Sequence, residues 1–281
     1  MATDDEVTEH DVETPDGRVL HAYDTGRGDL TVVWHHGTPN IGAPPAPLFA
    51  DSARLGIRWI SYDRPGYGGS TPRPGRDVAS AAADTAAVAD ASGVERFAVM
   101  GHSGGGPHAL ACAALLGDRV RSAVIGSGPA PFDAEGLDWF AGMGESSAAS
   151  LRAAAAGRDA KERFEATAEG EPDFIEADWA ALNGPWSWFG TVVGPAMAAG
   201  PAALIDDDLA YVSPWGFDPQ TITGPTLFVH GGDDRMVPAA HSAWLADRCA
   251  ESELRIAPGE GHVSILAVAG AAALEWIRTT A

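Results

Sequence analysis

The residues best suited to chemistry form the pentapeptide Gly101-His102-Ser103-Gly104-Gly105, which has the pattern G-x-S-x-G. It follows the apolar run 96–100 and precedes the alanine-rich, helix-forming run 106–116. A strand, a sharp turn and a helix would hold the serine hydroxyl at the apex, where glycines avoid clashes. A serine becomes a good nucleophile only beside a base and beside N–H groups that stabilise an oxyanion. The pattern therefore predicts a nucleophilic Ser103; the alternative is a serine that only caps the helix.

A nucleophilic serine needs a histidine base and a carboxylate that orients the base. Two further strand-like runs, 225–230 and 253–257, lead into loops that carry such residues. The first loop contains Asp233 and Asp234, and the second ends at His262. Because the carboxyl ends of parallel strands share one edge of a sheet, we expect these loops to meet the Ser103 turn. Either aspartate could instead form a turn, and His262 could be an ordinary loop histidine.

The elements that must hold these residues alternate along most of the chain. A hairpin is expected over residues 7–24, around Pro15-Asp16-Gly17. Between 133 and 212 no strand is expected. A helical segment is expected there at 151–169, and the stretch contains a cluster of aromatic residues. The sequence thus predicts an α/β core domain of residues 1–132 and 213–281, with a helical cap of residues 133–212 inserted over the strand ends. Further strands are expected at 30–35, 57–62, 96–101, 119–126, 225–230 and 253–257, with helical segments such as 77–91 in the gaps between them.

Four motifs in a fixed order resemble the α/β-hydrolase superfamily, over nearly the whole chain. They are His-Gly-Thr-Pro at 36–39, Asp-Arg-Pro-Gly-Tyr-Gly-Gly-Ser at 63–70, the serine pentapeptide, and His-Gly-x-x-Asp-x-x-Val-Pro at 230–238 followed by Gly-x-Gly-His ending at 262. The resemblance implies the α/β-hydrolase fold, with a mostly parallel eight-stranded sheet, helices on both faces and an inserted helical cap. It also implies that Asp234, rather than Asp233, is the acid.

The same resemblance implies an oxyanion hole and a serine mechanism without a cofactor. In enzymes of this type the donors are the backbone N–H after the nucleophile, here Gly104, and the N–H after the His-Gly pair, here Thr38. Epoxide hydrolases and haloalkane dehalogenases carry an aspartate where this chain has Ser103, and dienelactone hydrolases carry a cysteine. Peptidases similar to proline iminopeptidase usually have Trp-Gly after the serine, whereas this chain has Gly104 and Gly105.

Composition limits the partners and the compartment. The formal net charge of −21 argues against binding to nucleic acid or to anionic membrane surfaces, both of which need basic patches. Residues 1–6 have no basic or apolar run, so no secretory signal is expected, and no apolar stretch reaches the ~20 residues of a membrane helix. The two cysteines, Cys112 and Cys249, provide no disulfide framework, and no metal-ligand cluster is evident. A cytoplasmic protein is expected, with its oligomeric state open.

The predicted cap carries much of the negative charge and many aromatic residues. It holds fifteen Asp and Glu residues against four Lys and Arg. We expect most of these carboxylates to be solvated, although a few could bind a substrate amine. Outside the cap, Asp63 is expected to order the 65–69 loop, and His102 to point away from the site. Six apolar side chains could line a substrate pocket or simply pack the cap onto the core: Trp139, Phe140, Met143, Trp186, Trp188 and Phe189.

The predicted function is a serine hydrolase that cleaves a small, largely apolar carboxylic ester or lactone through an acyl-enzyme, with a small molecule as its partner. The same triad would also serve an amidase or aminopeptidase, a carbon–carbon bond hydrolase or a perhydrolase. An alternative of another class is a ligand-sensing receptor on a hydrolase fold, and a third is an inactive homologue in which Ser103 and His262 do not converge.

Overall fold

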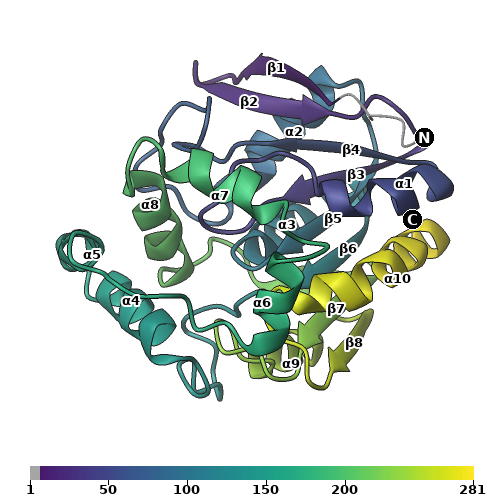
Figure 1. The fold of residues 1–281 in the computed structure, drawn as a ribbon. Coiled ribbons are helices and arrows are strands. Elements are labelled where there is room, and N and C mark those ends of the chain that lie inside the picture. Colours follow the sequence, from purple (N-terminus) through teal and green to yellow (C-terminus); the bar gives the residue numbers. More distant parts are fainter. Residues whose placement is uncertain (1–6) are drawn as a thin grey trace.

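The computed structural model describes residues 7–281. Residues 1–6, in which no secretory signal is expected, lie outside the described part of the chain. Eight strands form one sheet in the order β1-β2-β4-β3-β5-β6-β7-β8 (Figure 1). Their bounds are β1 (Thr8–Glu13), β2 (Val19–Asp24), β3 (Leu30–His35), β4 (Ile57–Tyr62), β5 (Phe97–His102), β6 (Val120–Gly126), β7 (Thr226–Gly231) and β8 (Ser252–Ala257).

The sheet is antiparallel only at its start. β1 and β2 form the expected hairpin, and β2 pairs antiparallel with β4. All remaining neighbours, from β4 to β8, are parallel. This is the α/β-hydrolase architecture that the motifs predict, and each strand expected from the sequence is present within two residues of its expected bounds.

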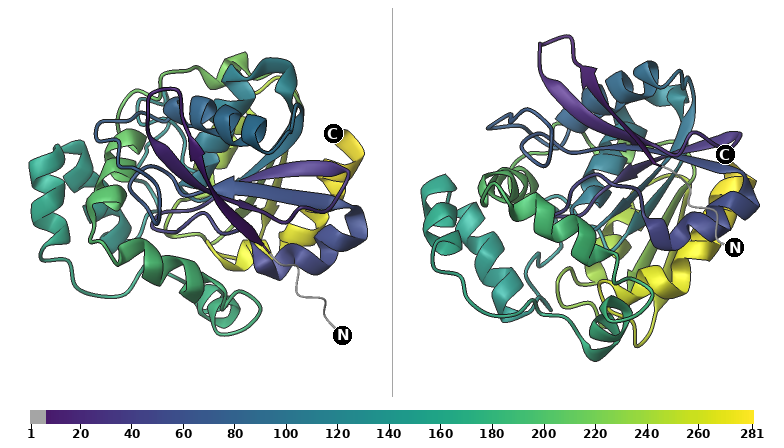
Figure 2. Two further views of the ribbon diagram at one scale, coloured as in Figure 1. Left: turned by 90° about the horizontal axis from the view of Figure 1, so that it is seen from above. Right: turned by 45° about the horizontal axis from the view of Figure 1, so that its top comes forward.

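Helices cover both faces of the sheet (Figure 2). α1 (Phe49–Leu55) and α10 (Ser264–Thr280) pack together on one face. On the other face lie α2 (Ser80–Ala91), α3 (Gly105–Leu115) and α9 (Ala240–Ala246). Short 3₁₀ turns occur at η1 (Ala46–Leu48), η2 (Gly117–Arg119) and η3 (Pro219–Thr221).

Two hydrophobic layers hold these helices to the sheet. Because successive side chains of a strand point to opposite faces, each central strand supplies both layers. In β5, Val99 packs in the layer beneath α2 and α3, whereas Met100 packs in the layer beneath α10. Every residue of β3, β5 and β7 is buried. Strands buried on both faces read as continuous apolar runs, which explains why they could be recognised in the sequence.

The strand order creates a crevice between β3 and β5. From β3 the chain moves outward to β4, and it then returns to the other side of β3 as β5. Loops that leave the carboxyl ends of β3 and β5 therefore diverge, and ligands commonly bind at such a point in open α/β sheets. The His36–Pro39 segment follows β3 and Ser103 follows β5, so both motifs start at this crevice.

Between β6 and β7, residues 133–212 contain helices and no strand, and we call this segment the helical insertion. Its first two helices, α4 and α5, stand away from the sheet (Figure 1). The single helical segment expected at 151–169 is in fact divided between two helices, because Gly157, with φ of 102°, interrupts the helical conformation. The helices of the insertion are α4 (Glu145–Ala155), α5 (Arg158–Glu165), α6 (Glu176–Leu182), α7 (Phe189–Met197) and α8 (Ala202–Tyr211).

Candidate active site

Ser103 occupies the sharp turn between β5 and α3. Its φ of 54° lies in the left-handed region, which is uncommon for a residue with a side chain. The Ser103 N–H donates to the carbonyl oxygen of Gly126 on β6 at 2.8 Å, which fixes the turn to the sheet. Strain of this kind is typical of functional positions and of the nucleophile elbow in particular.

The glycines around Ser103 permit close backbone packing. A Cβ built at Gly105 would collide with the carbonyl oxygens of His35 and His36, and one at Gly101 would collide with the carbonyl of Gly105. A side chain at Gly105 would therefore push the serine turn away from the β3 loop, and one at Gly101 would force the turn itself open. The G-x-S-x-G spacing is thus explained by contacts on both sides of the serine.

His262 lies against Asp234, the residue that the motif alignment selects as the acid. The Nδ1 atom of His262 is 2.8 Å from Oδ2 of Asp234. The other carboxylate oxygen, Oδ1, accepts the N–H groups of Met236 and Val237 at 2.8 and 2.9 Å. Asp234 is buried, whereas its neighbour Asp233 is exposed. With Nδ1 held by the carboxylate, Nε2 is the ring nitrogen available to a hydroxyl group.

The electrostatics of this pair favour an ionised acid and a basic imidazole. Burial by itself raises the pKa of Asp234, but His262 and His230 more than offset it and hold the pKa well below its usual value. Burial lowers the pKa of His262, yet Asp234 and, to a smaller extent, Asp178 raise it above its usual value. His230 contacts the same carboxylate, with Nε2 3.3 Å from Oδ2. A carboxylate so placed stabilises a protonated imidazole.

His102 supports the backbone of His262, and its ring lies beside the His262 imidazole with a centroid separation of 5.0 Å. Its Nε2 atom donates to the carbonyl oxygen of His262 at 2.8 Å. Burial lowers the pKa of His102 to about 3, so the ring is neutral at pH 7. On another side, the Phe174 ring stacks on the His262 imidazole with a centroid separation of 6.5 Å. Packing therefore restrains the orientation of His262.

Thr38 and Gly104 lie next to each other across the crevice. A Cβ at Gly104 would lie 2.6 Å from Oγ1 of Thr38 and would also collide with the hydroxyl of Tyr211. The Thr38 hydroxyl donates to the Asp207 carboxylate at 2.6 Å and lies 2.8 Å from the Tyr211 hydroxyl. The two residues that the resemblance implies for an oxyanion hole are therefore adjacent. Their contacts reach α8 of the helical insertion.

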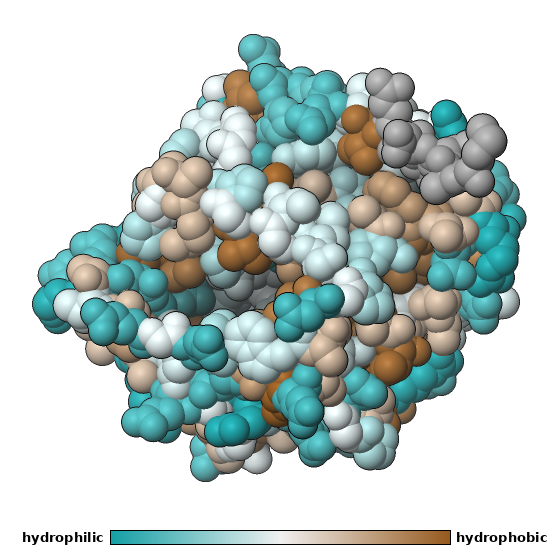
Figure 3. Space-filling view, in the orientation of Figure 1, coloured by the Kyte–Doolittle hydropathy of each residue, from teal (hydrophilic) through white to brown (hydrophobic). Residues whose placement is uncertain are grey.

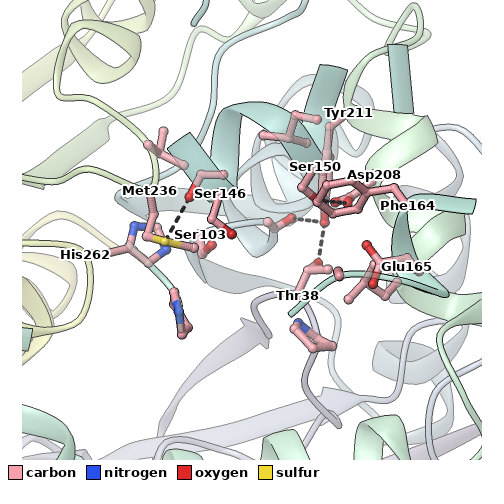
Figure 4. Close-up of a pocket in the computed structure, with 18 of the residues that line it drawn as sticks. Thr38, Ser103, Ser146, Ser150, Phe164, Glu165, Asp208, Tyr211, Met236 and His262 are labelled. Carbon is pink, nitrogen blue, oxygen red and sulfur yellow. Dashed lines mark hydrogen bonds between the residues drawn. The ribbon is translucent and has the colours of Figure 1, made fainter. Parts of the chain in front are cut away.

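These side chains surround one cavity of about 350 Å³ (Figure 4). Ser103, Gly104, Thr38 and His262 line its inner end. The volume is at the small end of the range of ligand pockets. In the space-filling view the surface is hollowed between the protruding lobe on the left and the main body (Figure 3). Apolar groups of its walls come from Trp139, Leu151, Phe164, Leu204, Met236 and Val237.

The aromatic residues expected in the pocket are mostly elsewhere, which corrects the sequence prediction. Only Trp139 belongs to the wall. Trp186 and Phe189 are buried in the hydrophobic layer beneath α10, with Trp188 packed against it. Phe140 packs on Trp139 and beneath the guanidinium of Arg152, and Met143 is half-buried in the turn before α4. Composition marks such side chains as apolar, but burial in the core satisfies them as well as a pocket wall does.

The outer wall is acidic. Among the described residues that line the cavity are Glu165, Glu169, Glu171 and Asp208, and none is a lysine or arginine. Lys161 is buried behind this wall, with Nζ 2.6 Å from both Glu165 and Asp208. Burial raises the pKa of Asp208 to about 6. The cavity therefore presents negative potential to its contents.

Several carboxylates of the insertion are buried and partnered, contrary to the expectation of a solvated acidic surface. Asp178 of α6 accepts the N–H groups of Val263 and Ser264 at 2.7 and 2.9 Å. Asp207 of α8 contacts Arg64 and Arg76. Each partner is distant in the sequence, and no local pattern connects the pairs. Asp63 does order its loop, accepting the Gly69 N–H at 2.9 Å.

Within residues 7–281 no group of three or more His, Cys, Asp or Glu side chains could hold a metal ion. No single helix in this part of the chain is long and apolar enough to cross a membrane. Taken together, α7 and α8 have the length and apolar composition of a membrane span, but the two helices are bent by 104° at the break between them.

The chain belongs to the alpha/beta hydrolase fold family, whose model matches residues 31–267. It is 29% identical over 238 residues to a non-heme chloroperoxidase of Streptomyces lividans, covering 83% of this chain and 84% of that protein. It is 27% identical over 274 residues to a non-heme haloperoxidase of Rhodococcus erythropolis, covering 89% of this chain and 92% of that protein. The solved structure of a thermophilic esterase from Thermogutta terrifontis superposes with a TM-score of 0.70 at 22% identity, covering 97% and 99% of the two chains.

Proposed function

We propose that the protein is a serine hydrolase that cleaves a small, uncharged carboxylic ester or lactone through an acyl-enzyme. The observation that carries the proposal is the 2.8 Å contact between Asp234 and His262, which lines the same cavity as the strained Ser103. Membership of a hydrolase fold family supports the reaction class. In this proposal Ser103 is the nucleophile, His262 the general base and Asp234 the residue that orients the base.

The reaction proceeds in two halves. Oγ of Ser103 attacks the carbonyl carbon while its proton passes to Nε2 of His262. The bond to the leaving oxygen then breaks, and His262 returns the proton to that oxygen, so that an alcohol departs. In the second half water attacks the acyl carbon and gives its proton to His262. The acid is released and Ser103 regains the proton.

The negative charge that forms on the carbonyl oxygen needs donors in the crevice. The backbone N–H groups of Thr38 and Gly104 are the proposed donors, supported by the closeness of the two residues. Loss of one such donor typically costs about 3 kcal/mol in the barrier. Ser103 and Gly104 both line the cavity, so a carbonyl bound there would contact the nucleophile and the donor together.

The cavity limits the substrate. Its volume of about 350 Å³ suits a short acyl group, and the apolar part of its walls suits a hydrocarbon chain. The helical insertion would act as a cap, since α4, α5 and α8 supply Ser150, Phe164 and Leu204 to the walls. The carboxylates of the outer wall argue against an anionic acyl chain. A neutral substrate is therefore proposed.

A second candidate is cleavage of an amide or peptide that carries a free amine. Glu169 and Glu171 favour it, because carboxylates in a cavity whose described lining residues include no lysine or arginine would attract an ammonium group. The names of the chloroperoxidase and haloperoxidase relatives also call for hydrogen peroxide to be tested in place of water as the acyl acceptor.

A fluorophosphonate probe and a series of p-nitrophenyl esters test the proposal, with Ser103→Ala as the control. Stoichiometric labelling and rapid ester turnover, both lost in Ser103→Ala, are expected. Labelling without ester turnover would direct the search to amides, carbon–carbon substrates or a ligand-sensing role. Turnover that survives Ser103→Ala would overturn the proposed mechanism, provided that circular dichroism confirms the fold of the variant.

A further inference from the structure

We infer that Asp207 and Tyr211, on α8 of the helical insertion, position the two backbone N–H groups that bind the oxyanion. The inference rests on the proposed function. It makes the insertion a part of the catalytic machinery, because it fixes the donors as well as covering the cavity. Neither residue belongs to a motif of the sequence, and both act through other groups.

Asp207 and Tyr211 lie four residues apart on α8, which sets them on the same face of the helix. Both are buried. Asp207 accepts the hydroxyl proton of Thr38 at 2.6 Å, and the Tyr211 hydroxyl donates to the carbonyl oxygen of Gly104 at 3.0 Å. One turn of helix therefore contacts both residues of the proposed oxyanion hole. Figure 4 shows Thr38 and Tyr211 joined across the crevice.

Asp207 also acts on the Thr38 peptide through Arg64. The two side chains form a buried ion pair, with Nη2 of Arg64 2.6 Å from Oδ2 of Asp207 and Nε 3.1 Å from Oδ1. The same Nη2 donates to the carbonyl oxygen of Gly37 at 3.0 Å, and Nη1 donates to the carbonyl of His36. The guanidinium thus bridges Asp207 and the backbone of the loop after β3.

The bond from Arg64 to the Gly37 carbonyl is the contact that bears on the Thr38 N–H. This carbonyl shares one planar peptide unit with the Thr38 N–H, so holding the oxygen fixes the direction in which the N–H points. Nδ1 of His36 contacts the same oxygen at 2.8 Å. A cation on the carbonyl also polarises the peptide and strengthens its N–H as a donor. The chain of contacts runs from Asp207 through Arg64 to the Thr38 donor.

On the other side of the crevice, Tyr211 restrains the Gly104 residue. The Ser103 carbonyl, which shares its peptide with the Gly104 N–H, accepts the N–H of Gly106 at 2.9 Å. Tyr211 holds the next peptide through the Gly104 carbonyl, and its own hydroxyl lies 2.8 Å from Thr38. The Tyr211 hydroxyl therefore bonds to Gly104 and packs against Thr38, so it contacts both residues that carry the donors.

The test uses Tyr211→Phe and Thr38→Val, which remove the two hydroxyls and keep the shapes of the side chains. Thr38→Ser retains the hydroxyl and should rescue the loss. Tyr62→Phe is the matched control, since its hydroxyl is also buried and bonds to Ala81 and Thr85, which are not among the described residues that line the cavity. Wild type and variants are compared by kcat and KM for a p-nitrophenyl ester, and by inhibition with butylboronic acid, which forms a tetrahedral anion on the serine.

We expect kcat of Tyr211→Phe and Thr38→Val to fall at least about tenfold with little change in KM, because misplaced donors lose stabilisation only in the transition state. The inhibition constant of the boronic acid should rise by a similar factor, while Tyr62→Phe stays near wild type and Thr38→Ser recovers most of the loss seen in Thr38→Val. Unchanged kcat and boronate affinity would overturn the inference, as would a loss confined to KM. Failure of the proposed function itself is recognised separately, by turnover that survives Ser103→Ala.

Discussion

The carboxylate of Asp178, on α6, accepts a 2.7 Å hydrogen bond from the N–H of Val263, the residue that directly follows His262. It accepts the N–H of Ser264 as well, at the amino terminus of α10. The helical insertion therefore holds the loop of the proposed base with one carboxylate, in addition to its contacts with Thr38 and Gly104. The same negative charge helps to raise the pKa of His262.

Asp178→Asn should move the acid limb of the pH–rate profile to lower pH. The proposed base must be neutral, so activity falls when the pH drops through the pKa of His262, which lies above its usual value. Asparagine keeps an oxygen for the Val263 N–H but removes the charge, and the pKa of His262 then falls. The profile of kcat/KM between pH 5 and pH 9 measures this shift. Glu176→Gln, on the exposed side of α6, is the control, and an unmoved limb would contradict the charge effect.

Asp234→Asn should cost far more activity than Asp233→Asn. Asp234 contacts His262 directly, and an amide there would favour the wrong tautomer, with an expected fall in kcat of about 10⁴-fold. Asp233 is exposed and contributes its N–H to the Glu260 carbonyl, which asparagine retains. Steady-state kinetics of the two variants decide the assignment. A larger loss in Asp233→Asn would mean that the acid has been misassigned.

Asp207→Ala should destabilise the fold much more than Asp206→Ala. Removing Asp207 leaves Arg64 and Arg76 buried without their carboxylate, which typically costs about 3–5 kcal/mol. The partner of Asp206 is Arg158, whose side chain is 38% exposed, so a loss of about 1 kcal/mol or less is expected. Urea denaturation followed by circular dichroism gives both free energies of unfolding. Equal losses of unfolding free energy in the two variants would show that the buried cluster around Asp207 stabilises the fold no more than the partly exposed ion pair does.

An anionic acyl chain should be a poor substrate. The p-nitrophenyl monoester of glutaric acid and p-nitrophenyl pentanoate have chains of similar length, but only the former brings a carboxylate to the acidic wall. We expect kcat/KM to be at least about tenfold lower for the glutarate ester, and the difference to shrink at high salt because of screening. Glu169→Gln should also reduce the difference in kcat/KM between the two esters. Equal rates for the two esters would place the acyl chain away from this wall.

The sequence was sufficient to predict the fold, the contact of His262 with Asp234 and the cavity that His262 shares with Ser103, because the signals are local. Each residue lies in the loop that follows the carboxyl end of a strand, and parallel strands bring these ends to one edge. Glycines at 101 and 105 and the turn residues around 234 mark the loops themselves. Short-range patterns of this kind survive in a single sequence, and they are enough to predict that three distant loops converge.

The contacts of α8 could not be inferred in the same way. Three consecutive aspartates there look like one solvated acidic run. In the folded chain they separate: Asp206 pairs with Arg158, Asp207 with Arg64 and Arg76, and Asp208 with Lys161. Neighbours in a helix point about 100° apart, so Asp207 meets two arginines of the core, whereas Asp206 and Asp208 meet two different residues of α5. Only the tertiary structure reveals which carboxylate reaches which cation.

The same run of aspartates limits how far the insertion can be exchanged. α4 and α5 contribute walls of the cavity and stand away from the sheet, so a homologous segment that keeps the partners of Asp206 and Asp208 could replace them and bring a new substrate preference (Figure 1). α6 and α8 carry Asp178 and Asp207, whose partners belong to the core. A chimera that imported these two helices from a relative would need the matching arginine and loop residues from the same donor. The boundary between interchangeable and fixed parts of this protein therefore runs through the insertion, after α5.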